Sequence, residues 1–392
     1  MPVIREKRFL RVKLDMVGMC QLKCVMCHFA HPDFVANTTQ MGRELLEKVG
    51  NDLFPRAHDV VLSSSAEPLL AKELPRALEL CREHNVPNFH FSTNGIALSQ
   101  RILDKIIEVQ MPLLTISCDG GTKETFERVR TPAKWERLMA AFDLVKETRR
   151  RTGSKTPRLS VTAVLMRSNI REMPGLIRLM REKGVEDMNF VHMAVMGGLG
   201  VEDETLLNDP KLCNDLLGQM EATAREVGMN VCLPMRIPET LHGDADDAVT
   251  DSTRSDAGGG HALSAPDALA ATSMDVADYL NKKNREFLLA AKQKDHHSRP
   301  CYFPWYYIHV NPDGTVFPCG SWFEFTTFGD FKTQDFRQIW TGKPYQELRQ
   351  QLYDMKLRDV CANCSVANMG RPDVKASFSH RAKVRRAQSD AR

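Results

Sequence analysis

Apolar and polar positions along the chain alternate between two kinds of segment. Short apolar runs typical of buried strands cover residues 9–16, 58–63, 88–92, 113–118, 158–166, 187–195 and 229–233. Longer stretches with apolar residues at helical spacing cover 42–52, 72–84, 100–110, 171–183 and 211–227. Strands that alternate with helices of this length pair in parallel through right-handed crossovers. The pattern therefore predicts an α/β protein built on a partial (β/α)6-type barrel.

The last part of the chain has a different pattern. The strand-like segments 305–310 and 315–318 flank the sequence Asn-Pro-Asp-Gly at 311–314, which is a strong hairpin signal. One amphipathic helix is expected at 336–353. These elements predict a small C-terminal domain that follows the barrel.

A change of composition separates the two parts. Residues 242–272 are rich in Asp, Ala, Gly and Ser and show no strand or helix period, which indicates a linker, with a lid over the site as the alternative. We therefore expect a barrel domain at 1–238 and a partly disordered linker at 239–294. The remaining expected parts are the C-terminal domain at 295–370 and a basic tail at 371–392.

Three thiols stand close together after the first predicted strand. Cys20, Cys24 and Cys27 form a CxxxCxxC pattern. Clustered thiolates of this kind hold iron–sulfur clusters, whereas a closed zinc site needs four ligands. Three ligands leave one iron of a cubane cluster open to bind a reactant. A zinc knuckle completed by His28 or His31 is one alternative, and unrelated core thiols are the other.

A second group of cysteines lies in the C-terminal part. Cys301 and Cys319, in a Cx12Gx4C pattern, fall near the two open ends of the predicted hairpin, and the helix leads to Cys361 and Cys364. Four thiolates complete the ligation of a [4Fe-4S] cluster. A structural zinc held by the same four cysteines is the alternative.

Polar residues follow the predicted strands closely. They include Ser65, Glu67, Asn94, Ser117 and Asn169. Each alone is most often part of a turn. Chemistry in parallel barrels is located at the carboxyl ends of the strands, so their succession at that end indicates a binding site.

The cysteine loop and these strand ends together resemble the radical SAM superfamily, in its SPASM/twitch branch with a single auxiliary [4Fe-4S] cluster. Glu67 looks like the end of the family's Gly-Gly-Glu element, and Ser117-x-Asp-Gly followed by Arg130 is similar to the branch signature. Serines and an alanine replace the usual glycines before Glu67. Met26 stands where many members carry an aromatic residue. The resemblance implies a partial radical SAM barrel with a twitch/SPASM-like domain, two [4Fe-4S] clusters and S-adenosyl-L-methionine (SAM).

The resemblance also implies which residues bind SAM. Glu67 and its neighbouring backbone hold the amino group, and Asn94 lies near the ribose. Ser117 and Arg130 bind the carboxylate, with Arg128 as the competing choice for Arg130. The remaining expected SAM-binding residues are Ser65 and Asn169.

A reaction type follows from this resemblance. One electron from an external flavodoxin or ferredoxin cleaves SAM to a 5'-deoxyadenosyl radical, which abstracts hydrogen from the substrate. A fully ligated auxiliary cluster has no free iron, so it is expected to accept an electron from the substrate radical. We therefore expect an oxidoreductase; epimerisation, or maturation of a ribosomal peptide, is the alternative. A non-catalytic iron or redox sensor would need neither Glu67 nor the other strand-end residues.

Composition and the start of the chain narrow the choice of substrate and compartment. The 19 residues before Cys20 leave no room for the N-terminal recognition domain of many peptide maturases, which favours a small sugar-like or aminocyclitol-like metabolite. The net charge of +3 does not favour nucleic acid or a membrane surface. No apolar run approaches the roughly 18 residues of a membrane helix. With 11 cysteines that fit metal chemistry better than disulfides, we expect a cytoplasmic protein.

Four cysteines stand outside both groups. Cys81 and Cys213 fall within predicted helices and are expected in the core. Cys118 and Cys232 lie at strand ends, where a thiol could return a hydrogen atom to a substrate radical. Core packing is the simpler interpretation of both.

The cysteine count predicts the iron content. Anaerobically reconstituted protein is expected to hold about eight irons, because two cubane clusters each contain about four, and no stoichiometric zinc. Changing Cys20, Cys24 and Cys27 together to Ala should remove about half of this iron, since one of two clusters loses its ligands, and abolish SAM cleavage. Iron and zinc analysis with a cleavage assay checks this. SAM cleavage by the triple variant would contradict the assignment.

Overall fold

The computed structural model describes residues 8–35, 38–63, 65–195, 198–237, 301–320, 326–354 and 356–362. The linker expected at 239–294 and the basic tail expected at 371–392 lie outside these residues, as does Cys364. The domain boundaries therefore stay predictions.

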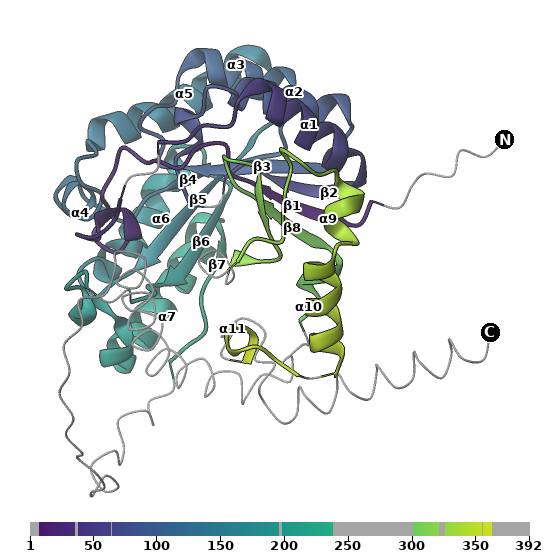
Figure 1. The fold of residues 1–392 in the computed structure, drawn as a ribbon. Coiled ribbons are helices and arrows are strands. Elements are labelled where there is room, and N and C mark those ends of the chain that lie inside the picture. Colours follow the sequence, from purple (N-terminus) through teal and green to yellow (C-terminus); the bar gives the residue numbers. More distant parts are fainter. Residues whose placement is uncertain are drawn as a thin grey trace, which may run out of the picture.

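Seven parallel strands form the first part of the sheet and follow one another in chain order. They are β1 (Leu10–Leu14), β2 (Ala57–Val61), β3 (Asn88–Thr93), β4 (Leu113–Ser117), β5 (Arg158–Leu165), β6 (Asp187–His192) and β7 (Asn230–Cys232). The helices lie along the outer side of the curved sheet in Figure 1. They are α1 (Arg43–Leu53), α2 (Leu74–Glu83), α3 (Gln100–Glu108), α4 (Lys123–Val129), α5 (Trp135–Thr152), α6 (Met173–Glu182) and α7 (Pro210–Val227). This arrangement confirms the predicted α/β fold with a partial barrel.

Two helices were not expected from the pattern. They are α4 and α5, between β4 and β5. The sequence holds signals for both: the Thr122 hydroxyl accepts a hydrogen bond from the Thr125 amide and caps α4, and Gly153 ends α5 in the left-handed conformation at φ 68°.

The single helix expected at 336–353 is two helices. α9 (Phe336–Trp340) begins with a capping box of Asp335 and Gln338, and α10 (Lys343–Asp354) follows it. Gly342 lies between them, and a Cβ atom there would stand 2.7 Å from the Gln338 carbonyl oxygen. Only glycine allows the backbone this close approach.

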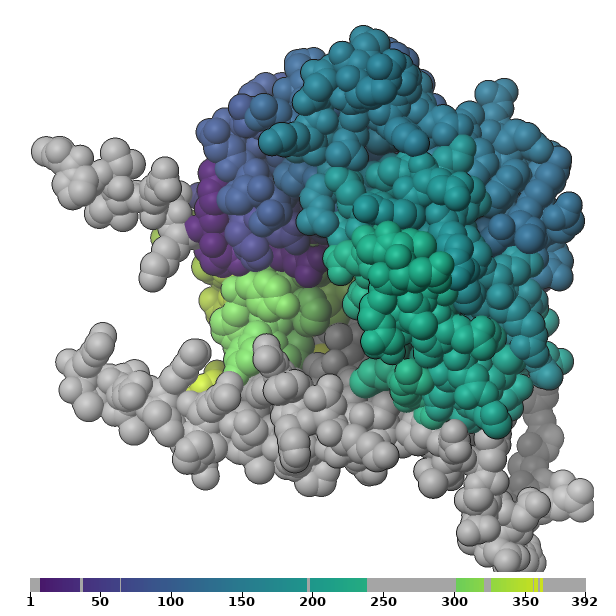
Figure 2. Space-filling view, turned by 180° about the vertical axis from the view of Figure 1, so that it is seen from behind, coloured from purple at the N-terminus to yellow at the C-terminus, as the bar shows by residue number. Residues whose placement is uncertain are grey.

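The C-terminal hairpin extends the barrel sheet. β8 (Tyr307–Val310) pairs in parallel with β1, and β9 (Thr315–Phe317) and β10 (Gly329–Asp330) continue the sheet in antiparallel order. Gly314 closes the predicted turn with φ at 89°. In Figure 2 the residues of the hairpin lie directly against the N-terminal residues. The described strands thus form one sheet of 10 strands.

Short helices complete the described chain. A last α-helix, α11, covers Asp359–Ala362. The 3-10 helices are η1 (His28–Ala30), η2 (Phe54–Arg56), η3 (Pro68–Leu70), η4 (Ile170–Glu172), η5 (Glu202–Glu204), η6 (Leu206–Asn208) and η8 (Phe303–Trp305).

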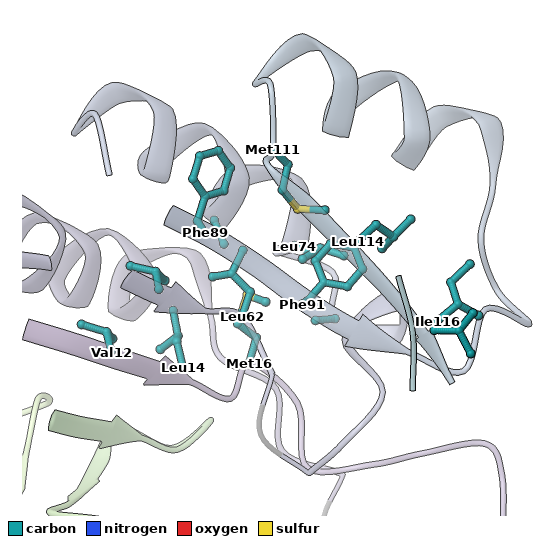
Figure 3. Packing of buried hydrophobic residues seen from close by; sticks show 14 of the residues in the cluster. Val12, Leu14, Met16, Leu62, Leu74, Phe89, Phe91, Met111, Leu114 and Ile116 are labelled. Atoms are coloured by element: carbon teal, nitrogen blue, oxygen red, sulfur yellow. The ribbon is translucent and has the colours of Figure 1, made fainter. Parts of the chain in front are cut away.

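The two faces of the sheet differ in polarity because side chains alternate along each strand. Phe89, Phe91, Leu114 and Ile116 pack between the strands and the helices, as Figure 3 shows. On each strand, the residues that alternate with such core residues face the other side of the sheet, away from the helices. Those residues include Arg11, Lys13, Asp59, His90, Ser92, Thr115, Ser117, Thr162 and Asn189. One face is therefore a dry core and the other a polar surface.

The difference between the faces predicts the effect of two neighbouring substitutions. Phe91 is fully buried, so Phe91→Ala should lower the free energy of unfolding by about 3–5 kcal/mol through lost burial and a cavity. Ser92 is exposed on the opposite face. Ser92→Ala should therefore change the free energy of unfolding by less than about 0.5 kcal/mol. Urea denaturation checks both. Equal effects of the two substitutions would contradict this orientation of β3.

Candidate active site

The cysteine loop follows β1 and is fixed by backbone hydrogen bonds on both sides. The Glu67 amide donates to the Met19 carbonyl at 3.0 Å, which ties the loop to the segment after β2. The amides of Lys23 and Val25 donate to the carbonyls of Thr131 and Val129 at 2.7 and 2.9 Å, which ties it to the segment after α4. The loop is therefore held at the carboxyl edge of the sheet before any ligand binds.

The three thiols of this loop have an environment that suits iron ligands. Cys20, Cys24 and Cys27 are half-buried, and Cys20 Sγ accepts a hydrogen bond from the Leu22 amide at 3.4 Å. Burial raises the pKa of all three thiols, and that of Cys24 to about 12, partly opposed by Arg130. A thiolate in such a place needs a nearby positive charge, which iron supplies. The donor set thus fits a cluster.

The zinc alternative finds less support in the geometry. His28 Nδ1 lies 3.7 Å from Cys27 Sγ, but the His31 ring packs on Gly198, where a Cβ atom would stand 2.4 Å from His31 Nε2.

Glu67 is a buried carboxylate between the cysteine loop and β3. It is only 3% exposed. Oε1 accepts hydrogen bonds from the Thr93 hydroxyl and the Leu69 amide, and Oε2 accepts one from the Asn94 amide at 2.8 Å. Burial raises the pKa of Glu67, and these hydrogen bonds oppose the rise. A carboxylate has about four acceptor positions, so Oε2 keeps one for a further donor. Ser65, nearby in the chain, is exposed.

The Asn94 side chain contacts the cysteine loop. Its Nδ2 donates to Cys20 Sγ at 3.8 Å, and its Oδ1 accepts from Gln21 Nε2 at 3.2 Å. The resemblance placed Asn94 near a ribose, whereas these contacts place its amide on a proposed cluster ligand. The sequence did not predict a role for Gln21, because a glutamine inside a cysteine loop belongs to no recognisable motif.

Arg130 forms a buried ion pair with Asp119. Arg130 Nη2 lies 2.7 Å from Asp119 Oδ2, and the two residues are 9% and 0% exposed. Arg128 is exposed, which favours Arg130 as the SAM-binding arginine. Burial opposes the charge of Arg130, but neighbouring anions, Asp119 foremost, raise its pKa overall. Its Nε has no hydrogen-bond partner in the described chain, so the guanidinium keeps a donor for a ligand.

The Asn169 side chain hydrogen-bonds to the backbone of the segments that carry the site. It is fully buried, and its Nδ2 donates to the carbonyls of Asp119 and Val164, both at 2.8 Å. Its Oδ1 accepts from the Met166 amide at 2.8 Å. Both amide hydrogens are thus used within the chain, so Asn169 positions Asp119 in this structure. Ser117, half-buried, ends β4 beside this network.

The cysteines outside the two groups fall into two environments. Cys81 and Cys213 are fully buried in the main core, as expected. Cys118 is also fully buried, and its thiol donates to the Gly120 carbonyl at 3.3 Å. Cys232 is exposed at the end of β7.

The C-terminal cysteines lie beside the hairpin. Cys301, Cys319 and Cys361 are half-buried and pack against the main core. Burial and then the neighbouring Cys319 raise the pKa of Tyr307 on β8, which places this thiol beside β8. Cys301 and Cys319 flank the hairpin, and Cys361 lies on α11; half-buried thiols of this kind suit thiolate ligands of a second cluster.

The parallel α/β sheet and its grouped thiols are typical of an iron–sulfur protein. Two family models match the chain and show which family this is. The Radical SAM superfamily model matches residues 15–180, and the SPASM model, an iron-sulfur cluster-binding domain, matches residues 301–365. The chain belongs to the radical SAM superfamily, in its SPASM branch, which confirms the resemblance. The domain pair implies [4Fe-4S] clusters and SAM as cofactors.

Curated relatives are similar at low identity. The Fe-coproporphyrin III synthase of Methanosarcina barkeri is 25% identical over 55% of this chain and 52% of its own. The probable GTP 3',8-cyclase of Methanocaldococcus jannaschii is 24% identical over 46% and 57%. The AdoMet-dependent heme synthase of M. barkeri is 20% identical over 89% of both chains. The chain spans about half the length of the first two relatives.

Solved structures of this branch share the fold. SuiB of Streptococcus suis bound to S-adenosylmethionine has a TM-score of 0.58 at 12% identity, over 91% of this chain and 69% of SuiB. anSMEcpe with bound AdoMet has a TM-score of 0.55 at 16% identity, over 86% and 82%. Within the described chain, no helix is long and apolar enough to cross a membrane.

The burial of Arg130 beside an exposed Arg128 predicts a clear difference in SAM binding. Arg130→Lys keeps the charge but loses the planar donor set, so the dissociation constant of SAM should rise about tenfold, which is about 1.4 kcal/mol. Arg128→Lys, the matched control, should leave it unchanged. Anaerobic equilibrium dialysis with labelled SAM, at equal iron content, measures both. A weaker affinity in the Arg128 variant alone would reverse the assignment.

Proposed function

We propose that this protein is a radical SAM oxidoreductase that oxidises a small sugar-like or aminocyclitol-like metabolite. One observation carries the proposal: β8 pairs with β1, so the hairpin with Cys301 and Cys319 lies beside the strand that leads into the Cys20 loop. A substrate radical formed at one cluster then has an electron acceptor within the same sheet.

The spacing of the cysteines in the sequence supports the ligand sets that we assign to the two clusters. Cys20, Cys24 and Cys27 hold the first [4Fe-4S] cluster and leave one iron for SAM. The second cluster is fully ligated by cysteine and therefore transfers electrons. Its proposed ligands are Cys301, Cys319, Cys361 and Cys364.

The chain's own residues place SAM against the first cluster. When bound, the cofactors supply reductive SAM cleavage to a 5'-deoxyadenosyl radical and an acceptor for one electron. Glu67 offers its remaining acceptor position to the amino group, and Arg130 offers its buried Nε–H to the carboxylate. Ser117, Ser65 and Asn94 line the same edge, and an external flavodoxin or ferredoxin supplies the initiating electron.

A small molecule is favoured over a peptide as substrate. The relative that matches 89% of this chain is an AdoMet-dependent heme synthase, and its name describes a small-molecule product. SuiB, with its precursor peptide SuiA bound, shares the fold at 12% identity. Likeness at that level extends to the fold alone, so maturation of a peptide is the weaker alternative.

Epimerisation is the second candidate, because one observation favours it. Register pairs Asn189 with Cys232 and Thr162 with Asn189, so the exposed Cys232 shares the polar face and the row of Ser117. A thiol there could return a hydrogen atom. Cys118, fully buried with its thiol bonded to a carbonyl, is less suited to this task.

Isotope transfer tests the proposal. Reconstituted protein, SAM and dithionite are incubated with a set of carbon-deuterated sugars and aminocyclitols. The expected result is singly deuterated 5'-deoxyadenosine and a product two hydrogens poorer, at one SAM per product, because the abstracted hydrogen stays on the nucleoside. Mass spectrometry measures both.

Two further results decide between the candidates. A product of unchanged mass that gains one deuterium in D2O, and loses this gain in Cys232→Ala, would establish epimerisation. Replacing Cys361 and Cys364 by Ala should keep SAM cleavage and abolish the oxidised product. If the soluble double variant still forms the oxidised product, electron transfer through the second cluster is ruled out.

A further inference from the structure

A buried histidine–carboxylate pair joins the two cysteine-bearing parts of the chain. His309, on β8, places Nε2 2.8 Å from Oδ2 of Asp15, which directly follows β1, and the two residues are 294 positions apart. Their side chains are only 4% and 6% exposed. Neither residue belongs to the proposed cluster ligands or SAM contacts, so the proposed function leaves this pair without a role.

The carboxylate determines which ring nitrogen of His309 carries the proton. An ionised carboxylate only accepts hydrogen bonds, so Nε2 of His309 is the donor to Asp15. Nδ1 of the neutral ring is then an acceptor, and no residue of the described chain donates to it. A buried acceptor without a donor costs about 1–3 kcal/mol. Nδ1 of His309 is therefore available to a ligand that brings a donor.

The register of β8 places His309 on the polar face of the sheet. Ile308 and Val310 belong to the main core, so Tyr307 and His309 face the opposite side. Lys13 of β1 is the register partner of His309.

Both proposed cluster sites flank this position. Cys20 follows Asp15 by 5 residues in the loop that continues β1. On the other side, β9 pairs Phe317 with His309, and Cys319 follows Phe317 by two positions. A substrate placed between the two clusters would therefore lie beside His309.

We propose that Nδ1 of His309 accepts the proton that the substrate loses on oxidation, and that Asp15 positions the ring. This inference rests on the proposed function. Transfer of a hydrogen atom from carbon to the 5'-deoxyadenosyl radical leaves a carbon radical with a hydroxyl or amino group. The O–H or N–H bond then breaks, its proton passes to Nδ1, and one electron reduces the second cluster. A carbon–oxygen or carbon–nitrogen double bond forms, so atoms and charge balance.

The same face provides a matched control. His90 on β3 lies 3.6 Å from Asp59, and Asp59 also pairs with Arg11 at 2.9 Å. This carboxylate is therefore already neutralised by an arginine. His90 as a residue is half-buried, but its Nδ1 atom, like that of His309, is buried and has no hydrogen-bond partner in the described chain. The two histidines share residue type, sheet face, a carboxylate partner and a buried Nδ1 without a donor. They differ in place and in partner: His309 lies on β8 beside β1, and Asp59, the partner of His90, is also paired with Arg11.

The first experiment separates proton acceptance from hydrogen abstraction. In His309→Gln the amide can still donate to Asp15, but no basic nitrogen remains. Deuterium transfer to 5'-deoxyadenosine from the substrate found by labelling should persist, while oxidised product falls at least tenfold. The ratio of 5'-deoxyadenosine to product therefore rises at least tenfold. His90→Gln should keep the wild-type ratio, and an unchanged ratio in His309→Gln would overturn the proposal.

The second experiment needs no substrate. EPR-monitored titration gives the potential of the second cluster between about pH 5 and 8. If one proton accompanies the electron, each tenfold change in proton activity shifts this potential by about 59 mV. Wild type and His90→Gln should show this slope, and His309→Gln should not. The other ionisable groups beside His309 include Arg11, Lys13 and Asp15 on β1, Tyr307 on β8 and Cys319 after β9, and all remain in the variant.

The two experiments also distinguish the proposal from the proposed function. If wild-type protein transfers no deuterium to 5'-deoxyadenosine, the proposed function fails. The measurement of the cluster potential tests the role of His309 alone, because it requires the second cluster and the His309 imidazole but no substrate. Equal slopes in wild type and His309→Gln would overturn the role of His309 even if the enzyme oxidises its substrate.

Discussion

The parallel pairing of β1 with β8 is the constraint on which both cysteine groups depend. β1 forms ladders with β2 on one side and β8 on the other, and the Asp15 amide extends the second ladder to the Val310 carbonyl at 2.9 Å. A slip of β1 by one residue would turn its buried Leu10, Val12 and Leu14 toward the polar face. The hydrophobic pattern of one strand therefore fixes the register of the Cys20 loop and of the hairpin together.

Buried charge at the carboxyl edge is balanced within the chain. Glu67 is held by three donors, and Asp119 by Arg130 and the Val164 amide at 2.7 Å. Groups buried in this way keep their orientation, because leaving any of them unpaired would cost several kcal/mol. The site is thus rigid before SAM arrives, which limits the reorganisation that binding requires. At this edge, Arg130 Nε is a buried donor that keeps unused hydrogen-bonding capacity for a ligand.

Local patterns in the sequence were sufficient for β1 to β9 and for most helices, because each depends on neighbours in the chain. The break at Gly342 was missed, because helical periodicity continues through it while backbone contact does not allow a side chain. The contact of Asn94 with Cys20, and the pairing of His309 with Asp15, join residues 74 and 294 positions apart. No local period encodes such pairs. They become visible only when parallel strands bring distant segments into register.

The position of β8 in the sheet also affects how the chain folds. Until the C-terminal hairpin has been synthesised, one edge of β1 exposes unpaired backbone groups beside an apolar strand, and such an edge is a template for pairing with other chains. Contacts between segments this far apart in sequence form slowly, since a long loop must close first. The hairpin is thus a late cover for an aggregation-prone edge as well as a carrier of cysteines. A shortened chain would expose this edge of β1 at the point where the cluster loop begins.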